Sequence, residues 1–590
     1  MRGMLDRVPK TASLKILFLT GVFLLVLSLA AQATGTEDVD ASLDQQTADQ
    51  ILLLLQQRYT SSGQSPHSVF LLTHKALGGY YAKRAYQPVW QEHGVLLPAA
   101  DQLVEHLRGA AEHGLCSDVY LLDQIEGMIY LYNEFARHQQ VMVPSQYALL
   151  DLMLTQAFLT YATHLVEGQV DPALAHVDWK ARRRKANLTR LLTYALKNNR
   201  LEQVLTGLLP PHPGYQALVK SLADYRELAA LGGWLSFPEG PTLRPGDQDE
   251  RVPLLRERLQ MTGDLSDESD AADLHYGEAD VEAVRAFQER HGLIVDGAVG
   301  KRTRQSLNVT VEHRIRQIEL NLERWRWMPK SLGERYVQVN IADFSLSVVE
   351  GESAVLSMPV IVGTAYRRTP VFSAKMTYLE LAPTWTVPPT ILREDKLPAI
   401  KADPDYLKRK HFRLLQREND AWVEVDTDEV AWSSVKIQNF PGILRQDPGP
   451  WNPLGRIKFM FPNRFNVYLH DTNERHLFAN QQRTFSSGCI RVAQPLELAH
   501  YLLRGVEGWG DDRLEAGLQR SEPLRVDIPE LPVHVQYWTA WVDADERVQF
   551  RSDIYYRDLD LDVALSEPDY QVESHLEISK SGPVSSGEPL

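Results

Sequence analysis

Several residue patterns on which common enzyme chemistries depend are missing from this sequence. It has 62 lysines and arginines against 77 aspartates and glutamates, a net charge of -15. This balance argues against a nucleic acid as partner, although a local patch could still bind a charged polymer. We find no glycine-rich phosphate loop and no His-x-x-x-His run. The sequence therefore predicts an enzyme or binding protein without a metal or other cofactor.

The N-terminus has the three parts of an export signal. Basic residues come first, an apolar run follows from Ile16 to Ala31, and Ala31-Gln32-Ala33 completes a small-residue cleavage site. We expect residues 1–33 to be a signal peptide, cleaved after Ala33, or else an uncleaved inner-membrane anchor. The membrane is expected to matter only through this segment, and the body to face an extracytoplasmic, oxidising compartment such as the periplasm.

Cysteine is scarce, and one of the two cysteines lies in an informative setting. Cys489 stands in Ser486-Ser487-Gly488-Cys489-Ile490-Arg491, and His470 precedes it in Tyr468-Leu469-His470-Asp471-Thr472. A histidine can take the proton of a cysteine thiol or sit beside the thiolate as imidazolium, lowering the pKa of the thiol. Gly488 lets the backbone turn tightly and aim N–H groups at one point, as an oxyanion hole requires. A working thiolate must stay free, so we predict that Cys116 and Cys489 do not pair.

These two segments resemble the signature of the L,D-transpeptidase catalytic domain. The usual form in that family is His-Gly-Thr with Ser-His-Gly-Cys. Here Asp471 and Ser487 replace the glycine and the second histidine, a form that resembles the large, multi-domain periplasmic branch. The resemblance extends from about residue 45 to 565.

The resemblance implies an enzyme that remodels peptidoglycan stem peptides without a cofactor. Cys489 would attack the carbonyl of the third stem residue, and an amine of another stem would resolve the thioester into a 3→3 crosslink. The family's usual acylation by carbapenems would also be expected at Cys489.

Other residues of the two segments are candidates for supporting roles. His470 would activate the thiol, and N–H groups around Ser487, Gly488 and Cys489 would hold the oxyanion. The small Ser486 would keep the approach open. Asp471 or a nearby backbone carbonyl would orient the imidazole, and Arg491 would order the loop or meet a substrate carboxylate. No metal ligand is expected.

The hydrophobic pattern changes from helical to strand-like along the chain, which predicts a multidomain α+β protein. Helical patterns at 45–240 resemble the scaffold domain of the same branch. Residues 246–309 resemble the small three-helix peptidoglycan-binding domain, although a spacer that binds nothing remains an alternative. Strand patterns dominate 314–565, the expected mainly β catalytic domain, and 566–590 reads as a disordered tail.

A long insertion interrupts the catalytic segment at 382–454. Its position just before the strands that lead to His470 resembles the capping subdomain of the large L,D-transpeptidases. A lid there would exclude water from an acyl-enzyme; an inert helical insertion is the alternative. Trp385, in a proline-rich stretch, is expected to anchor either a substrate or the base of the lid.

Two further readings of the whole chain stay open. One is a stem-peptide L,D-carboxypeptidase, with water as acceptor of the same thioester. The other is a catalytically silent wall-binding scaffold that recruits cell-wall synthesis proteins. The presence of both His470 and Cys489 favours an enzyme.

Overall fold

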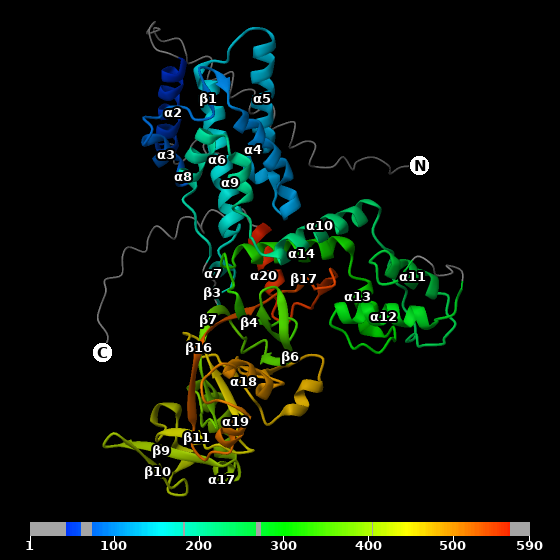
Figure 1. The fold of residues 1–590 in the computed structure, drawn as a ribbon, viewed down its shortest axis with the longest axis vertical. Helices are drawn as coiled ribbons and strands as arrows, with labels where there is room; N and C mark the ends of the chain where they lie inside the picture. The colour runs from blue at the N-terminus through cyan, green and yellow to red at the C-terminus, as the bar shows by residue number, and fades with distance from the viewer. Residues whose placement is uncertain are drawn as a thin grey trace, which may run out of the picture.

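The protein is elongated, with a helical part at one end and a small mixed subdomain at the other (Figure 1). The computed structural model describes residues 43–60, 74–176, 178–180, 183–266, 273–403 and 405–566. The segment at 1–33 and the predicted tail beyond Ser566 lie outside the described residues. A sheet lies at the centre of the molecule, and a three-helix module lies to one side (Figure 1).

The N-terminal helices surround one long apolar helix. This helix, α6 (Pro144–Glu167), is long and apolar enough to cross a membrane, but 89 % of its most apolar window is buried. Burial on every side is typical of the core helix of a helical domain. Around it lie α2 (Leu43–Thr60), α3 (Leu77–Ala82), α4 (Pro98–Arg108), α5 (Leu122–Arg137), α8 (Leu188–Asn198), α9 (Leu201–Thr206), and the short strands β1 (Gln91–Glu92) and β2 (Val95–Leu96), whereas the short helix α7 (Pro172–Ala175) lies beside β3 (Trp179–Lys180) at the central sheet (Figure 1).

The range 45–240 does not pack as one body. The core around α6 runs only from Ile51 to Leu208. Helix α10 (Pro213–Ala230) packs instead on α14 (Val311–Arg326) and on the hairpin β17 (Ala540–Val542)–β18 (Val548–Phe550). Strand β3 (Trp179–Lys180) joins the central sheet, where it pairs with β7. The segment 45–240 therefore contacts the central sheet directly, through β3, in addition to being joined to it along the chain.

The small module consists of three helices around its own core. They are α11 (Val252–Gln260), α12 (Glu278–Arg290) and α13 (Lys301–Leu307). His291, at the end of α12, stacks on Phe550 with a ring separation of 5.6 Å. Arg551 also donates to the backbone carbonyl of Arg290 at 2.9 Å. These contacts hold the module against the hairpin.

The central sheet closes on itself. Its strand order is β12-β13-β15-β6-β5-β4-β16-β7-β3, and β12 also pairs with β7, so that eight strands form a ring. Closure leaves those strands without a free edge. They are β4 (Arg335–Asn340), β5 (Ser345–Glu350), β6 (Ser353–Gly363), β7 (Val371–Leu381), β12 (Ile457–Met460), β13 (Leu469–His470), β15 (Ile490–Val492) and β16 (Leu524–Gln536); β14 (Thr484–Ser486) adds to β6, and α18 (Pro495–Leu503) and α19 (Asp511–Leu518) follow β15. The predicted fold class, multidomain α+β, is confirmed.

The insertion at 382–454 forms a small subdomain with its own sheet and core, which we call the cap. Its sheet has the order β10-β9-β11-β8, and its core includes Leu414 and Leu444. The elements are β8 (Trp385–Thr386), α15 (Pro389–Ile391), a π-helical turn (Leu392–Lys396), α16 (Leu397–Ala402), α17 (Tyr406–Arg409), β9 (Phe412–Glu418), β10 (Ala421–Val425) and β11 (Ile443–Gln446). The cap is thus not a helical insertion.

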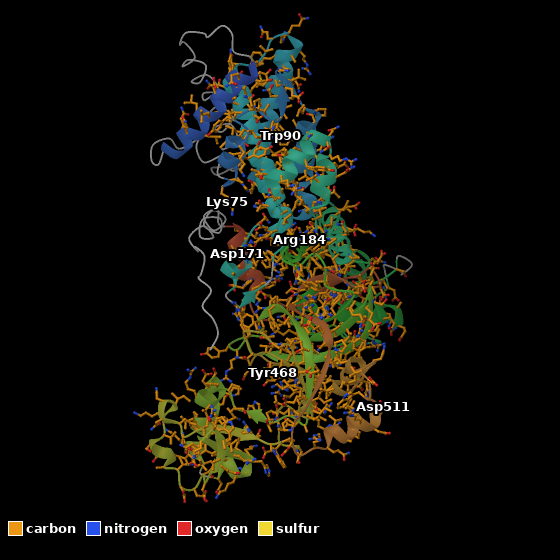
Figure 2. All side chains as sticks on the ribbon, turned by 60° about the vertical axis from the view of Figure 1, so that its left-hand side comes forward. Lys75, Trp90, Asp171, Arg184, Tyr468 and Asp511 are labelled. Atoms are coloured by element: carbon orange, nitrogen blue, oxygen red, sulfur yellow. The ribbon has the colours of Figure 1, made fainter. Side chains whose placement is uncertain are left out.

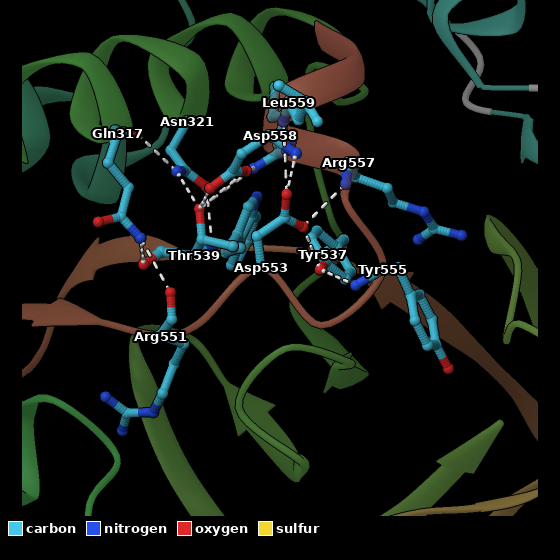
Figure 3. Close-up of polar contacts among 12 residues, drawn as sticks. Gln317, Asn321, Tyr537, Thr539, Arg551, Asp553, Tyr555, Arg557, Asp558 and Leu559 are labelled. Carbon is cyan, nitrogen blue, oxygen red and sulfur yellow. Dashed lines mark hydrogen bonds and ion pairs between the residues drawn. The ribbon is translucent and has the colours of Figure 1, made fainter. Parts of the chain in front are cut away.

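A buried polar network locks α14 to the C-terminal segment (Figure 3). Gln317 donates to the carbonyls of Thr539 and Arg551, each at 2.9 Å. Thr539 exchanges hydrogen bonds with Asn321, and its hydroxyl donates to Asp558 at 2.8 Å. These contacts join segments more than 200 residues apart and brace the start of α20 (Arg557–Ser566).

Candidate active site

Two parallel strands bring the histidine and the cysteine segments side by side. In β13 and β15, Leu469 pairs with Ile490, and His470 pairs with Arg491. Leu469 and Ile490 are fully buried in the core of the ring. Because side chains alternate along a strand, the residues on either side of each belong to the opposite face. That face carries Tyr468, His470, Cys489 and Arg491.

This face looks toward the cap. Tyr468 packs against the core of the cap and is labelled in Figure 2, where it lies between the cap and the sheet. Its ring lies 5.6 Å from that of His470, in a T-shaped arrangement. The site therefore lies between a rigid closed sheet and a subdomain with a separate core.

His470 is buried and held as a neutral imidazole. Its Nδ1 lies 2.5 Å from the carbonyl oxygen of Asp471. With a proton on Nδ1 this contact is a hydrogen bond, and Nε2 then keeps its lone pair. Burial, followed by the positive charge of Arg491, lowers the pKa of His470 to about 3. The ring is therefore uncharged at neutral pH, with the lone pair of Nε2 unoccupied.

Cys489 is a free, partly exposed thiol. Its Sγ lies 3.9 Å from the carbonyl oxygen of Asn466, and the hydroxyl of Tyr468 lies beside it. Within the described residues, no hydrogen bond joins Sγ to His470. In strand register Tyr468, and not His470, stands opposite the cysteine.

Burial raises the pKa of the Cys489 thiol above its ordinary value and outweighs the opposing effects of Tyr468, Lys458 and Arg491. The resting pair is thus a neutral thiol with a neutral imidazole. Desolvation thus opposes the lowering of the thiol pKa that an imidazolium beside Cys489 would give, and the neutral ring supplies no charge to offset it.

The turn before Cys489 is braced by hydroxyl groups. Gly488 has φ +112°, a conformation that side chains rarely adopt. Ser486 Oγ donates to the carbonyl of Cys489 at 2.5 Å and accepts from the N–H of Gly488 at 3.1 Å. Thr369 Oγ1 donates to the carbonyl of Gly488 at 2.9 Å. Ser486 is therefore a brace for the turn.

These contacts change the expected oxyanion group. The N–H of Gly488 already donates to Ser486 Oγ. Gly488 is therefore not available as the oxyanion donor that the sequence predicts. The N–H groups of Ser487 and Cys489 have no hydrogen-bond partner among the residues that the structure describes. These two donors remain for an anion at the turn.

Comparison with known families identifies the sheet-rich part. Residues 334–512, from the first strand of the ring to the start of α19, match the L,D-transpeptidase catalytic domain. The chain contains an L,D-transpeptidase catalytic domain. Residues 75–222 match a family described as "Scaffold domain", and residues 248–307 match one described as "Putative peptidoglycan binding domain".

One curated relative and one solved structure are similar to parts of the chain. A protein of Haemophilus influenzae named "Putative L,D-transpeptidase" is 34 % identical over 252 residues, which are 42 % of this chain and 49 % of that protein. The chain thus spans about half the length of this relative. A crystal structure of the L,D-transpeptidase (residues 123–326) from Xylanimonas cellulosilytica is 17 % identical, with a TM-score of 0.16. The match covers 51 % of this chain and 100 % of that one.

Asp471 makes separate contacts with its backbone carbonyl and with its side-chain carboxylate. Its carbonyl faces His470, whereas its carboxylate accepts from the N–H of Arg456 at 2.8 Å and from Arg475 at 2.5 Å. Gly455 has φ +59°, and a Cβ there would lie 2.3 Å from the Asp471 carboxylate. The carboxylate therefore fixes the turn before β12 and does not touch the imidazole.

The Asp471 carboxylate should matter for stability more than for chemistry. Asp471→Ala leaves a partly buried N–H unpaired, so we expect the free energy of unfolding to fall by about 1–3 kcal/mol. Asp471→Asn keeps one acceptor and should cost less. Turnover by the folded Asn variant should stay close to that of the wild type, because the acceptor facing His470 is main chain. Denaturant unfolding and turnover assays check both expectations; a collapse of turnover in folded Asp471→Asn would contradict them.

Two other predicted residues lie outside the reacting group. Arg491 donates to Glu474 at 2.5 Å and so orders the loop after His470. Trp385 is buried in the core of the cap, 5.9 Å from Phe412. It anchors the base of the cap and offers no surface to a substrate.

Sequence reasoning missed three residues of the site. Tyr468 could have been found from strand alternation, since it lies two residues before His470. Thr369 and Tyr555 gave no signal, because only the folded ring brings them to the turn. Tyr555 donates to the carbonyl of Gly363 at 2.5 Å and accepts from the N–H of Thr369 at 3.3 Å. The network of Figure 3 thereby extends to the support of the cysteine turn.

The raised thiol pKa predicts slow alkylation at neutral pH. A thiol whose pKa lies above the ordinary value of about 8.5 has less thiolate at pH 7.5, and its thiolate fraction keeps rising above pH 9. We expect iodoacetamide to modify Cys489 more slowly than the exposed Cys116 at pH 7.5, with a rate that still rises above pH 9. Peptide mass analysis of timed samples reports both cysteines at once. A fast reaction of Cys489 with a plateau below pH 8 would indicate a thiolate–imidazolium pair instead.

Proposed function

We propose that this chain is a peptidoglycan L,D-transpeptidase that forms 3→3 crosslinks between stem peptides through a thioester on Cys489. The observation that supports this most directly is the single face of β13 and β15, which carries a free thiol and a neutral imidazole under the cap. The matched catalytic, scaffold and peptidoglycan-binding families support peptidoglycan as the substrate.

In the first step, Cys489 Sγ attacks the carbonyl carbon of the third stem residue. His470 Nε2 accepts the thiol proton as the C–S bond forms, which suits a neutral thiol beside a neutral base. The oxyanion is held by the N–H groups of Ser487 and Cys489. The C–N bond to the terminal D-alanine breaks, and His470 returns the proton to the leaving amine.

In the second step, a side-chain amine of another stem attacks the thioester carbonyl. Its proton passes to His470, the C–S bond breaks, and the sulfur regains a proton. Tyr468, opposite Cys489 in register, is placed to donate to the sulfur as charge develops on it. Carbapenems, which present a strained carbonyl, would acylate the same sulfur.

The cap favours transfer over hydrolysis. Water on the same thioester would make the enzyme an L,D-carboxypeptidase, and a lid over the site disfavours that outcome by excluding water. The substrate is extracytoplasmic, so we propose that residues 1–33 export the chain to the periplasm. The wall-binding alternative without catalysis needs neither His470 nor Cys489.

Product analysis tests the proposed function. Purified protein is incubated with tetrapeptide-bearing muropeptides, and products are identified by mass. Loss of D-alanine with the appearance of dimers crosslinked between third residues supports the transpeptidase. Tripeptides with no dimer would indicate the carboxypeptidase, and unchanged muropeptides the silent scaffold.

A further inference from the structure

One arginine connects the cap to the cysteine turn. Arg367 lies in the loop between β6 and β7, and its guanidinium forms a two-point pair with Asp395, at 2.8 and 2.9 Å. It also donates to Glu394 at 2.7 Å. Both carboxylates belong to the π-helical turn Leu392–Lys396 of the cap, a kind of turn that is rare and often found at functional sites.

The same guanidinium reaches the turn that carries the nucleophile. Arg367 Nη1 donates to Ser487 Oγ at 2.9 Å. The backbone of the loop that contains Arg367 also contacts this turn, because the N–H of Thr364 donates to the carbonyl of Ser486 at 3.0 Å. Ser487 is one of the two residues whose N–H is free for an oxyanion. Nη1 of Arg367 therefore contacts both Asp395 of the cap and the hydroxyl of Ser487, a residue that also carries one of the free N–H groups.

We propose that Arg367 is a positioning residue that couples docking of the cap to the geometry of the oxyanion donors. This proposal rests on the proposed function. When the cap is docked, Asp395 and Glu394 fix the guanidinium, and the guanidinium holds Ser487 in place beside Cys489. When the cap moves away, Ser487 loses its partner and the turn loses one support. Acylation is thus linked to a closed cap, which is also the state that excludes water.

Isolated surface ion pairs contribute little, but this contact differs from them in two ways. It is a two-point arginine–carboxylate pair, the geometry that gives the strongest side-chain hydrogen bonds. It is also a network, because Arg393 donates to Glu394 at 2.7 Å, and the Arg367 side chain is only 21 % exposed. Arg367 lowers the pKa of Asp395, and Arg393 with Arg367 lowers that of Glu394.

The test compares variants on both sides of the contact. Arg367→Gln removes the coupling from the sheet side, and the double variant Glu394→Gln/Asp395→Asn removes it from the cap side. Arg393→Gln is the matched control, because this cap arginine touches Glu394 but not the cysteine turn. The first readout is the rate of Cys489 acylation by a carbapenem, measured by intact-protein mass. The second is hydrogen exchange of residues 389–402, which requires no activity.

We expect Arg367→Gln and the double variant to acylate about tenfold more slowly than the wild type, since each loses charge-assisted hydrogen bonds. Both should exchange faster at 389–402, and Arg393→Gln, which removes one contact of Glu394 but leaves every contact of Arg367 in place, should change much less than either. The charge-swapped pair Arg367→Glu/Asp395→Arg should recover the slow exchange that Arg367→Glu alone loses.

Two results would overturn the proposal. Slow acylation in Arg367→Gln with normal acylation in the double variant would mean that the arginine meets the substrate directly. Unchanged exchange in all variants would mean that the cap is held without it. If the wild type is not acylated but exchange responds as expected, the proposed function fails while the link between cap and turn stands.

Discussion

Cys489→Ala is expected to abolish both D-alanine release and crosslinking, with a loss of at least about four orders of magnitude, as for removal of other enzyme nucleophiles. Alanine lacks the sulfur that forms the thioester, and the N–H groups of the turn alone cannot replace it. Folding should be unaffected, because the change removes only a sulfur atom and Cys489 belongs to none of the hydrophobic cores. Turnover of tetrapeptide muropeptides and thermal unfolding measure the two effects.

Cys116→Ala is the matched control for this change. Cys116 is exposed and lies in the helical part, far along the chain from the sheet. Its replacement should leave turnover and unfolding as in the wild type. Activity retained by Cys489→Ala, or lost in Cys116→Ala, would mean that another group attacks the substrate.

His470→Ala is expected to lower turnover by about 10²–10⁴-fold, the usual contribution of a positioned acid–base group. The effect should be large here because the resting thiol is neutral, so a base must remove its proton during attack. The pKa of His470, lowered to about 3, leaves Nε2 unprotonated over the whole neutral range, and the weakly basic ring receives the proton only as the C–S bond forms. Release of D-alanine at saturating donor measures the loss.

His476→Ala is the control, since His476 is exposed in the short 3-10 helix Arg475–Ala479 that follows His470. It should behave as the wild type. If turnover of His470→Ala is unchanged, proton transfer takes another route. Tyr468→Phe then becomes the decisive variant, because the Tyr468 hydroxyl lies beside the sulfur.

The proposed nucleophile and its histidine could be located from sequence because each stands in a short local pattern. Leu469 and Ile490 are apolar residues that alternate with polar ones, and the fold buries them in the ring, leaving His470 and Cys489 on the opposite face. The alternation of apolar and polar residues along a strand is a local property, so it can be recognised without knowing which strands pair with it.

What the sequence could not supply depends on the closure of the sheet. Arg367 and Thr369 meet the cysteine turn only because β15 pairs with β6, whose following loop contains both. The raised pKa of Cys489 likewise follows from burial, which no spacing of residues reveals. The proline-rich setting of Trp385 predicts an anchor for either a substrate or the base of the lid, and only the folded cap distinguishes the two, by burying the ring in its core.

The limits of the helical part also depended on tertiary contacts. The pattern at 45–240 is helical almost throughout, yet α10 packs on α14 and β3 pairs with β7. Local periodicity indicates the kind of secondary-structure element but not the element that it packs against. The helices of this single range therefore belong to two hydrophobic cores.

The central claim is a thioester on Cys489, and trapping it is the most direct test. Protein mixed with a tetrapeptide donor, without acceptor, is quenched in acid within the first turnovers and analysed by intact and peptide mass. The account predicts a donor stem lacking its terminal D-alanine attached to the peptide that contains Cys489, with no such adduct on His470→Ala at the same time point. D-Alanine released in a burst with Cys489 unmodified, or an adduct on any other residue, would contradict it.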